Sequence, residues 1–475
     1  MARKHNNHTG LKVFLILLML VFIAGSFLMI SLSLDIAGSA APTRPSGSSI
    51  VLPTAPEETD VPTQPQTEAP TETTQPEPES VVSTARISAQ GDLLMHKFLF
   101  DGNSQVQRET GVYDFSSIFH YISDVTSSYD YAIANLETTF GGDEFPYQGN
   151  PSFNCPDPFV DSIVSAGYDM LLTANNHSYD TLMTGITRTL ETVRSAGLET
   201  LGTRLTEDEL RYSIVEINDI KVGMVCYTYT SGMSNDGRPR LNGNTPVEKP
   251  ALVNWFSNTN PDKLYTEMET ILSDMEANGA EATMLFIHWG NEYELKENSH
   301  QNKMAQKLCD LGVDVIVGGH PHVVQPMELL TSSSDPAHKT ICVYSMGNAV
   351  SNQRYGNIPS CPTPHTEDGI LFEITFEKYS DGTVYVQSVD ILPTWVNLHK
   401  RNGGSEYNIL PLDKAQEDQW QERFDLTDAN LDAAKRSWDR TMAIIGEGLQ
   451  QVQDHLAQEK ADREAHYLEL ASGNA

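Results

Sequence analysis

Side chains of the kinds that bind metals or move protons recur directly after short apolar runs in this sequence. Each run holds four to six mostly aliphatic residues and is followed by glycine and polar residues. Carboxylate, amide and imidazole groups together form a ligand set for a divalent transition metal such as Mn, Fe or Zn. The residues at or just past these run ends are Asp92, Glu137, Asn176, His177, His288, His320 and Asn348.

A single polar residue at such a position is more often a loop cap than a ligand, but the same residue types at six or seven run ends point to a site. His322 adds an imidazole two residues after His320. Two metals about 3.5–4 Å apart can hold a phosphoester for in-line displacement, and His177 could protonate the leaving oxygen. Six residues suffice for two metals that share a carboxylate: Asp92, Glu137, Asn176, His288, His320 and His322.

The apolar runs alternate with helical patterns from about Thr84 onward, which predicts a mixed α/β fold. "TMLFIHWG", "VDVIVGGH" and "TICVYSMGN" are apolar on both faces, as strands covered by helices are. Helices are predicted over 157–167 and 181–197, each ending at a glycine. In open α/β sheets, ligands bind beyond the carboxyl ends of the strands, which is where the candidate residues are expected.

An ordered set of motifs resembles the CapA family of poly-γ-glutamate capsule biosynthesis proteins. The resemblance covers about 85–395 and is carried by "QGDLLMH", "ANLETTF", "TANNHSYD", "FIHWGNEY", "GGHPHVVQPME" and "YSMGNAV". It implies a calcineurin-like metallophosphoesterase fold, a layered αββα sandwich, over 84–400. It also implies a role in envelope or capsule polymer biosynthesis.

The resemblance also implies roles for single residues. Asp92 would open the first metal site, and Glu137 would bridge the two metals. Asn176 and His177 match an Asn-His pair that acts as ligand and acid. His288 matches an isolated histidine motif, and His320 and His322 match a motif that gives one ligand to each metal.

Three further residues are weaker candidates. His96 departs from the Asp-x-His pattern because it follows Asp92 by four residues; it either takes that ligand's place or faces the substrate. Arg354 is a candidate anion contact because a guanidinium suits phosphate or carboxylate. Asn348 is a second candidate for substrate binding.

The N-terminal region predicts export of the remaining chain. Residues 13–34 carry no charge and are long enough to span a bilayer, and basic residues in 1–12 should keep that end cytoplasmic. A cleaved signal peptide ending near "AGSAA" is the competing interpretation. Residues 35–83 are rich in Pro, Thr and Glu and predict a disordered stalk. The expected location is therefore the cell membrane, with a single span and an extracytoplasmic domain.

Composition restricts the partners. With 31 basic and 64 acidic residues, the net charge is −33, which excludes nucleic acid and anionic lipid as general partners. An anionic substrate, whether polymer or phosphoester, would need local positive charge such as a metal site. Five cysteines form no dense disulfide framework, and pairing of Cys155 with Cys361 is an open hypothesis.

The region 401–475 is predicted to be a largely helical C-terminal extension. From Asp428, apolar residues recur at alternating spacings of three and four, which gives one stripe on a long charged helix. This helix either packs on the main domain or pairs with a partner. Gly446 and Gly448 weaken it as an autonomous coiled coil.

Two functional hypotheses follow. The first is a membrane-anchored, extracytoplasmic, two-metal hydrolase acting on a phosphoester or related bond. The second is a non-catalytic component of a capsule polymer synthesis and export complex, whose cleft binds polymer ends. A metal-stabilised binding domain without turnover is a third possibility.

Overall fold

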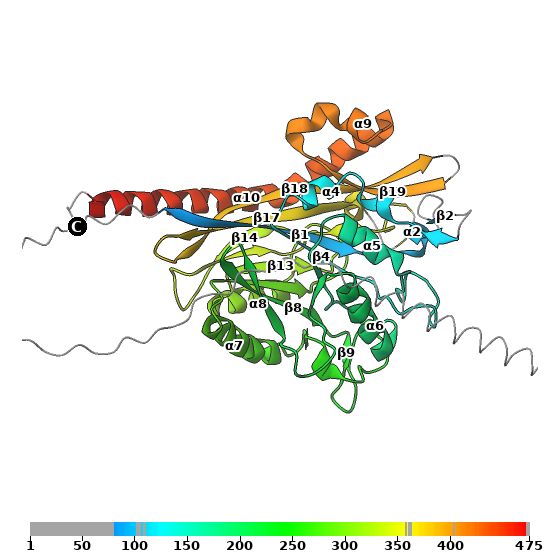
Figure 1. Ribbon diagram of the computed structural model, residues 1–475, viewed down its shortest axis with the longest axis horizontal. Coiled ribbons are helices and arrows are strands. Elements are labelled where there is room, and N and C mark those ends of the chain that lie inside the picture. The colour runs from blue at the N-terminus through cyan, green and yellow to red at the C-terminus, as the bar shows by residue number, and fades with distance from the viewer. Residues whose placement is uncertain are drawn as a thin grey trace, which may run out of the picture. The chain divides into compact units, whose positions relative to one another are not determined.

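The computed structural model of the chain describes residues 80–100, 106–107, 111–356, 359, 363–401 and 404–471 (Figure 1). The expected segments 1–12 and 13–34, and all but the end of 35–83, lie outside these residues. Among the residues described, no helix is long and apolar enough to cross a bilayer. The membrane anchor and the stalk therefore stay predictions.

Two large sheets form the centre of the fold. In the described part of the chain, the first sheet has eight strands, and β16 pairs with the end of β1. Its path runs through β19 (Gly404–Pro411), β18 (Val384–Arg401), β17 (Asp368–Tyr379), β1 (Val81–Leu93), β4 (Tyr131–Asn135), β5 (Met170–Leu172) and β6 (Glu199–Leu201), with β16 (Asn348–Val350) beside β1.

The second sheet has seven strands within the same residues, and β7 pairs with β8 off the main path. Its order is β11 (Trp255–Phe256), β8 (Ile220–Tyr229), β12 (Ala282–His288), β13 (Val315–Gly319), β15 (Lys339–Val343) and β14 (Met327–Thr331), with β7 (Tyr212–Ile217) beside β8. Two short ribbons are also present: β2 (Val106–Gln107) with β3 (Val112–Tyr113), and β9 (Gly232–Met233) with β10 (Pro239–Arg240).

The helices connect and cover these strands. The α-helices are α2 (Lys97–Phe100), α3 (Ser116–Phe119), α4 (Ser123–Thr126), α5 (Pro158–Ser165), α6 (Leu182–Ser195), α7 (Asp262–Ala277), α8 (Ser299–Asp310), α9 (Trp420–Arg423) and α10 (Asp428–Ala471). The 3-10 helices are η1 (Pro250–Leu252), η2 (Pro364–Glu367) and η3 (Lys414–Gln419).

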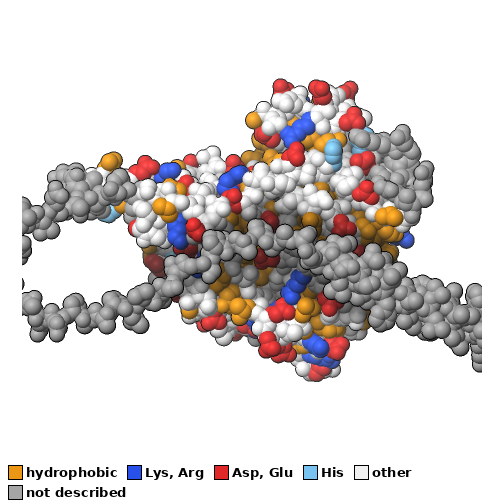
Figure 2. Space-filling model, viewed as in Figure 1, with side chains coloured by type: hydrophobic (Ala, Val, Ile, Leu, Met, Phe, Trp, Pro, Cys, Tyr) orange, Lys and Arg blue, Asp and Glu red, His pale blue; other side chains and the backbone are white. Residues whose placement is uncertain are grey.

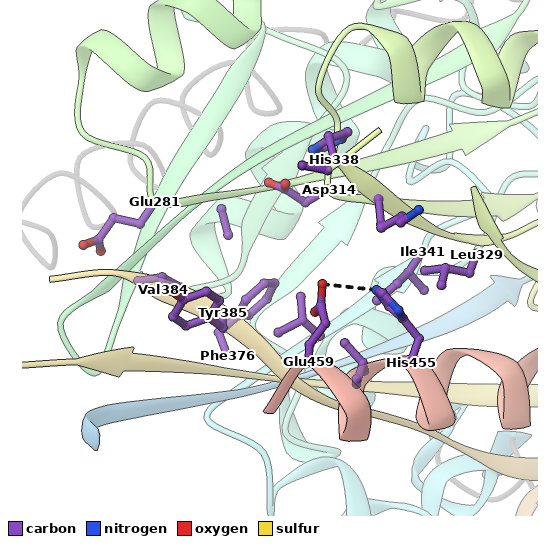
Figure 3. Close-up of a pocket in the computed structure, with 15 residues that line it drawn as sticks. Glu281, Asp314, Leu329, His338, Ile341, Phe376, Val384, Tyr385, His455 and Glu459 are labelled. Carbon is purple, nitrogen blue, oxygen red and sulfur yellow. Dashed lines mark ion pairs between the residues drawn. The ribbon is translucent and has the colours of Figure 1, made fainter. Parts of the chain in front are cut away.

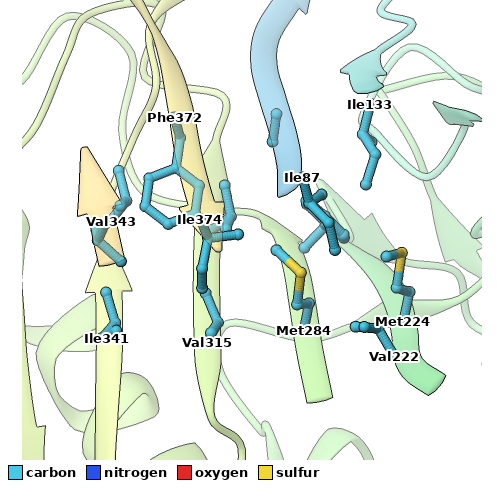
Figure 4. Packing of buried hydrophobic residues seen from close by; sticks show 14 of the residues in the cluster. Ile87, Ile133, Val222, Met224, Met284, Val315, Ile341, Val343, Phe372 and Ile374 are labelled. Carbon is cyan, nitrogen blue, oxygen red and sulfur yellow. The ribbon is translucent and has the colours of Figure 1, made fainter. Parts of the chain in front are cut away.

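The two sheets face each other across an apolar core. Alternate residues of each strand point into this layer, because side chains alternate between the faces of a sheet. Figure 4 shows Ile87 of β1 and Ile374 of β17 in the same cluster as Met284 of β12 and Val315 of β13. In β13, and at all but one position of β12, the other alternate residues are also buried, as the continuous apolar runs predict.

Helices cover the outer faces of the sheets. Leu171 of β5 packs in one cluster with Phe159 of α5. Leu285 of β12 packs in another cluster with Met268 of α7 and Leu308 of α8. Figure 1 shows α7 and α8 together on the side of β8 and β13. The layers are therefore helix, sheet, sheet and helix, and the fold is of the expected mixed α/β class.

The long C-terminal helix α10 docks on the sheets. It runs along β17 and β18 (Figure 1) and also contacts β14 of the second sheet. Ile445, Leu449, Val452 and Leu456 belong to the core between the sheets. The apolar stripe is thus used within the chain, which decides between the two expectations for this helix.

A cavity of about 190 Å³ lies beside α10, between the start of β12 and β18. Figure 3 shows His455 and Glu459 of α10 on one side and Asp314 with His338 on the other. The imidazole of His455 and the carboxylate of Glu459 are 3.2 Å apart. This cavity is at the opposite strand ends from the candidate metal ligands, so it is not part of their site.

Two expected boundaries are corrected by the strands. β1 begins at Val81, so residues 81–83, expected in the linker, belong to the first sheet; their pairing with β17 overrides their linker-like composition. The region 401–475, expected to be a largely helical extension, begins with a strand, because β19 pairs with β18 from Gly404 to Pro411. The boundary at 400/401 therefore falls within a β-hairpin of the main sheet.

The surface and the cysteines add two observations. On the face drawn in Figure 2, acidic and basic side chains are scattered, without a continuous basic patch among the residues described. Cys155 is a buried free thiol. Cys361 lies outside the described residues, so its pairing with Cys155 stays a hypothesis.

Candidate metal centre

The predicted ligands gather at one edge of the two sheets. β1 and β4 run parallel in the first sheet, as do β8, β12 and β13 in the second. Asp92 lies near the end of β1, Glu137 two residues beyond β4, and His288 at the end of β12. Strands that run parallel place their carboxyl ends together, which is why residues almost 200 positions apart in the chain meet.

Glu137 occupies the middle of the cluster. Its side chain is fully buried, and neither carboxylate oxygen has a hydrogen-bond partner. Oε1 lies 3.5 Å from Nε2 of His288 and 3.9 Å from Nε2 of both His322 and His177. Burial, followed by the nearby charge of Asp92, raises the pKa of Glu137 well above its ordinary value. A buried carboxylate without partners is costly unless a cation or proton neutralises it.

Asn176 and His288 point at one another across the sheets. The amide oxygen of Asn176 lies 2.7 Å from Nε2 of His288, so the two expected ligand atoms already converge. Burial lowers the pKa of His288 to about 3, with further lowering by His322 and His177 against the raising effect of Asp92. The ring is therefore neutral at physiological pH, which is the form that coordinates metals.

His320 and His322 lie in the loop after β13 with left-handed backbone conformations, at φ values of 97° and 57°. Such angles are unfavourable for residues with a Cβ and are found mostly where function requires them. Gly319 lets the backbone before His320 lie close to Asp92, because a Cβ at this position would be only 3.2 Å from Oδ1 of Asp92. Burial and the neighbouring His288 lower the pKa of His320, and its Nδ1 has no hydrogen-bond partner.

Hydrogen bonds from neighbouring polar side chains position Asp92. Nδ1 of His322 lies 3.0 Å from Oδ2 of Asp92, while Asn135 donates to Oδ1 at 2.8 Å. Asn175 in turn donates to the side-chain oxygen of Asn135. Burial opposes ionisation of Asp92, but the contacts with His322 and Asn135 outweigh it, and the pKa is lowered. Asp92 is therefore a carboxylate, the form a metal ligand requires.

His177 is oriented by an acid that sequence reasoning missed. Its Nδ1 lies 2.7 Å from Oδ2 of Asp180, whose other oxygen accepts a hydrogen bond from Asn242 at 2.9 Å. Asp180 is buried and also accepts from the backbone of Phe153. With Nδ1 donating to Asp180, Nε2 faces Glu137. The acid three residues after the histidine in "NHSYD" was the signal that could have found this pair.

His96 lies beside the cluster. It belongs to neither group of residues whose ligand atoms converge, and its ring packs edge-on against Phe153. Its Nδ1 is 3.2 Å from the backbone N–H of Asn352 and 3.3 Å from the carbonyl of Leu94. The Asn352 N–H can only donate, and the Leu94 carbonyl already accepts from the backbone of His96. The neutral tautomer in which Nδ1 accepts from the Asn352 N–H carries its proton on Nε2, which is then a hydrogen-bond donor.

The two expected substrate contacts are occupied by the protein. Arg354 donates to the carbonyl of Val396 and pairs with Glu367 at 3.0 Å. Asn348 is buried, and its amide nitrogen donates to the carbonyls of His322 and Thr366. These partners are distant in sequence, so the pattern could not reveal them. Arg354 therefore holds β18 and η2 together, while the amide nitrogen of Asn348 holds the backbone of His322 and its Oδ1 has no partner.

Two residues near the cluster were not predicted as site residues. Tyr229, the last residue of β8, lies with its ring centroid 4.7 Å from that of His320. Burial, followed by the charges of Glu292 and Glu137, raises the pKa of Tyr229, so its phenol is neutral. Glu292 is exposed at the edge of the cluster. Like the predicted ligands, Tyr229 ends a parallel strand, which was the signal for it.

The residues fit divalent metals. Two groups have ligand atoms that all lie within 4.8 Å of one another: Glu137 with His320 and His322, and Asp92 with Glu137 and His288. Glu137 is common to both, as a bridging carboxylate would be. Its two oxygens and Nδ1 of His320 are buried without partners, and such groups call for an ion. The donor set of nitrogen and oxygen atoms suits Mn, Fe or Zn.

A fold with this strand-end cluster places the chain in a class of α/β proteins with a candidate metal centre between two sheets. Comparison with known proteins identifies the family. The chain belongs to the family described as bacterial capsule synthesis protein PGA_cap, whose model matches residues 86–353. These residues run from β1 to just beyond β16 and include every predicted metal ligand.

Two curated relatives carry the name expected from the motifs. The PGA biosynthesis protein CapA of Bacillus subtilis (strain 168) is 24% identical over 305 residues, which cover 63% of this chain and 70% of the relative. The capsule biosynthesis protein CapA of Bacillus anthracis is 26% identical over 331 residues, covering 68% and 69%. The expected resemblance to the CapA family is thus confirmed.

A solved structure of a purple acid phosphatase from yellow lupin (Lupinus luteus) seeds is a distant neighbour. It is 9% identical, with a TM-score of 0.27, and the match covers 64% of this chain and 53% of that one. At this level the likeness carries no argument about function.

Proposed function

We propose that this chain is a metal-dependent hydrolase of the calcineurin-like metallophosphoesterase type, acting on a phosphoester or a related bond during capsule or envelope polymer biosynthesis. The observation that carries the proposal is Glu137, a fully buried carboxylate with both oxygens free of hydrogen bonds. Nitrogen atoms of three histidines lie within 3.9 Å of it. This arrangement suits a carboxylate that bridges two divalent metals.

Each predicted ligand has a place in this proposal. Asp92 is in contact with His322, Asn176 meets His288, and both of these histidines lie within 3.9 Å of Glu137. His320 completes the set with its unpartnered Nδ1. Bound divalent metals would supply Lewis acidity to a phosphoryl or carbonyl oxygen of the substrate. The histidines whose pKa values burial lowers stay neutral and available as ligands.

His177 is the group that would move a proton. Its Nδ1 is held by Asp180, so Nε2 is the nitrogen that faces the cluster. When Nε2 is protonated, the Asp180 carboxylate stabilises the imidazolium, and the proton can pass to the leaving oxygen. His96 would contribute a hydrogen bond from Nε2 to a substrate oxygen.

The charge of the molecule limits the substrate. A net charge of −33 opposes the binding of a long polyanion along the surface. A single anionic group, such as a phosphoester or the end of an anionic polymer, could still be captured at metals. The cell membrane, through residues 13–34, and capsule polymer synthesis or export proteins are the partners we propose.

The names of both curated relatives favour a second candidate function. They are described as biosynthesis proteins, not as hydrolases. The same cleft could bind polymer ends in an assembly and export complex without cleaving a bond. The metals would then hold the terminal anionic group of the polymer.

Metal analysis combined with turnover assays separates these candidates. The purified chain is loaded with Mn, Fe or Zn, and bound metal is measured by elemental analysis. Hydrolysis of monoester and diester phosphate substrates is then followed, with His320→Ala and Glu137→Gln as the loss variants. About two metals per chain, with turnover lost in both variants, would support the hydrolase.

Stoichiometric metal without turnover of any ester would support the binding function instead. Absence of bound transition metal under all loading conditions would refute both. Lys378→Met is a suitable control for nonspecific effects, because Lys378 pairs with Glu281 at the opposite end of the strands.

A further inference from the structure

Tyr229 is an aromatic residue that ends the central strand β8 beside the proposed metal ligands. It follows Thr228, which is in register with His288 on the neighbouring strand β12. Its ring is parallel to that of His288 within 5°, at a centroid distance of 6.5 Å, and tilted against the ring of His320 at 4.7 Å. The two histidines therefore fix the plane and position of the phenol.

The hydroxyl of Tyr229 differs from those of neighbouring tyrosines in the described part of the chain. No described group hydrogen-bonds to it, although neighbouring tyrosines of the same sheet have partners: Tyr227 donates to Glu267 and Tyr344 to Glu328. Tyr229 is only partly buried, so its hydroxyl is not sealed in the core. A partly buried donor with no protein partner is available to a ligand.

The surroundings of the hydroxyl indicate what it faces. The charges that act on it most strongly are those of Glu292, at the exposed edge, and Glu137, in the middle of the cluster. Tyr229 therefore lies beside the cluster, with its ring against His320 and within range of the charges of both acids. An ordinary phenol keeps its proton at neutral pH and donates well to an anionic oxygen.

We propose that the Tyr229 hydroxyl binds the substrate, donating a hydrogen bond to an oxygen of the anionic group that the metals hold. This inference rests on the proposed function, because it assumes that an anionic group reaches the cluster. Tyr229 is then a substrate-contacting residue on the side of His288 and His320. The charged groups that act on Glu137, Asp92 and His320 include no Lys or Arg. The Tyr229 hydroxyl would therefore supply a hydrogen-bond donor that the cluster otherwise lacks on this side.

The experiment uses the metal-loaded full chain and its Tyr229→Phe variant, with inorganic phosphate as the binding probe. Removal of one hydrogen bond to a charged oxygen is expected to weaken phosphate binding, measured by calorimetry, by about 10- to 100-fold. If the chain hydrolyses phosphoesters, kcat/KM is expected to fall by a similar factor. Bound metal should be unchanged, because the variant keeps the aromatic packing against both histidines.

Tyr212→Phe is the matched control. Tyr212 is a buried tyrosine at the start of β7, and its hydroxyl is 3.4 Å from the side chain of Asn278, away from the cluster. It should bind phosphate as the unmodified chain does. Equal phosphate affinity in Tyr229→Phe would overturn the inference while leaving the hydrolase intact. Loss of metal in that variant would also overturn it, because the hydroxyl would then be a metal ligand.

The two proposals fail in different ways. If the unmodified chain binds phosphate but hydrolyses no ester, the hydrolase is refuted, and weaker binding by Tyr229→Phe still supports the contact. If the metal-loaded chain binds no phosphate and cleaves no ester, both fall.

Discussion

Gly448 allows α10 to pass close to β14, and replacing it with alanine should loosen this contact. In an exposed helix the Gly→Ala change is stabilising by about 1 kcal/mol. Here, however, an added Cβ would lie 1.8 Å from the carbonyl oxygen of Met327 and 2.7 Å from its carbonyl carbon. Ordinary contact begins at 3.4 Å, so the helix would have to retreat by roughly 1.6 Å.

Such a retreat reduces the packing of the apolar stripe on both sheets. A gap of about 0.5–1 Å already removes a quarter to a half of a dispersion contact. Ile445, Leu449 and Val452, which are almost fully buried, would lose contacts together. Overpacking costs about 1–3 kcal/mol, and an overlap with backbone atoms belongs in the upper part of that range. After the gain of about 1 kcal/mol in helix propensity, we expect Gly448→Ala to lower the free energy of unfolding by about 1–2 kcal/mol.

Gly446 provides the matched control two residues away on the same helix. A Cβ there meets only the terminal methyl group of Met442, at 3.4 Å. Gly446→Ala should therefore keep the propensity gain and be neutral or more stable. Urea unfolding of both variants, compared by midpoint at equal m value, measures the difference. The reasoning is refuted if Gly448→Ala matches or exceeds the unmodified chain, or if Gly446→Ala is destabilised as much.

Three further substitutions test the site and the docking of α10. Glu137→Gln should reduce bound divalent metal, measured by elemental analysis, yet leave the chelated protein at least as stable to urea, because it removes a buried charge without partners. Asp180→Asn should lower kcat by about 10²- to 10⁴-fold at unchanged metal content, because an amide does not hold the His177 ring in the same tautomer. Arg440→Met should lower the free energy of unfolding by up to about 3 kcal/mol at pH 8, two pH units above a pKa of about 6, because Asp368 loses its charge partner and keeps only the hydrogen bond from Ser437. Burial raises the pKa of Asp368 to about 6 from an ordinary 3.8, so stability falls as pH rises through this window; without Arg440 the pKa rises further, and the loss should be much smaller at pH 5.

The gathering of the candidate metal ligands could be predicted because these residues obey a local rule. Each follows an apolar run directly, and parallel strands bring such run ends to one edge whatever lies between them. Asp92, Glu137 and His288 therefore needed no knowledge of the loops to be placed together. Asp180 could have been found because it is an acid three residues after His177. Tyr229 could have been found because it ends a parallel strand, as the candidate ligands do.

The errors concern residues whose partners are remote in sequence. The guanidinium of Arg354 could bind an anion, but it donates instead to the carboxylate of Glu367 and to a backbone carbonyl of β18. β19 was missed because an edge strand is stabilised by its partner more than by its own pattern. The apolar stripe of α10 was predicted, but only tertiary packing decides which surface covers it. Gly448 is the clearest case. A glycine is unfavourable in an isolated helix, but here the backbone of Met327 leaves no room for a Cβ.

The electrostatics of the site connect the composition to the chemistry. Asp92 and Glu137 lie in the centre of the site, and Glu292 lies at its edge. Asp180 contacts Nδ1 of His177. Besides burial, the groups that act on the central residues are these acids and the neighbouring histidines, and none is a Lys or Arg. Alone, such a cluster would repel phosphate and carboxylate alike, whereas two divalent cations would reverse its sign. Anion binding here should therefore depend entirely on the metal, with Tyr229 and His96 adding orientation and not charge.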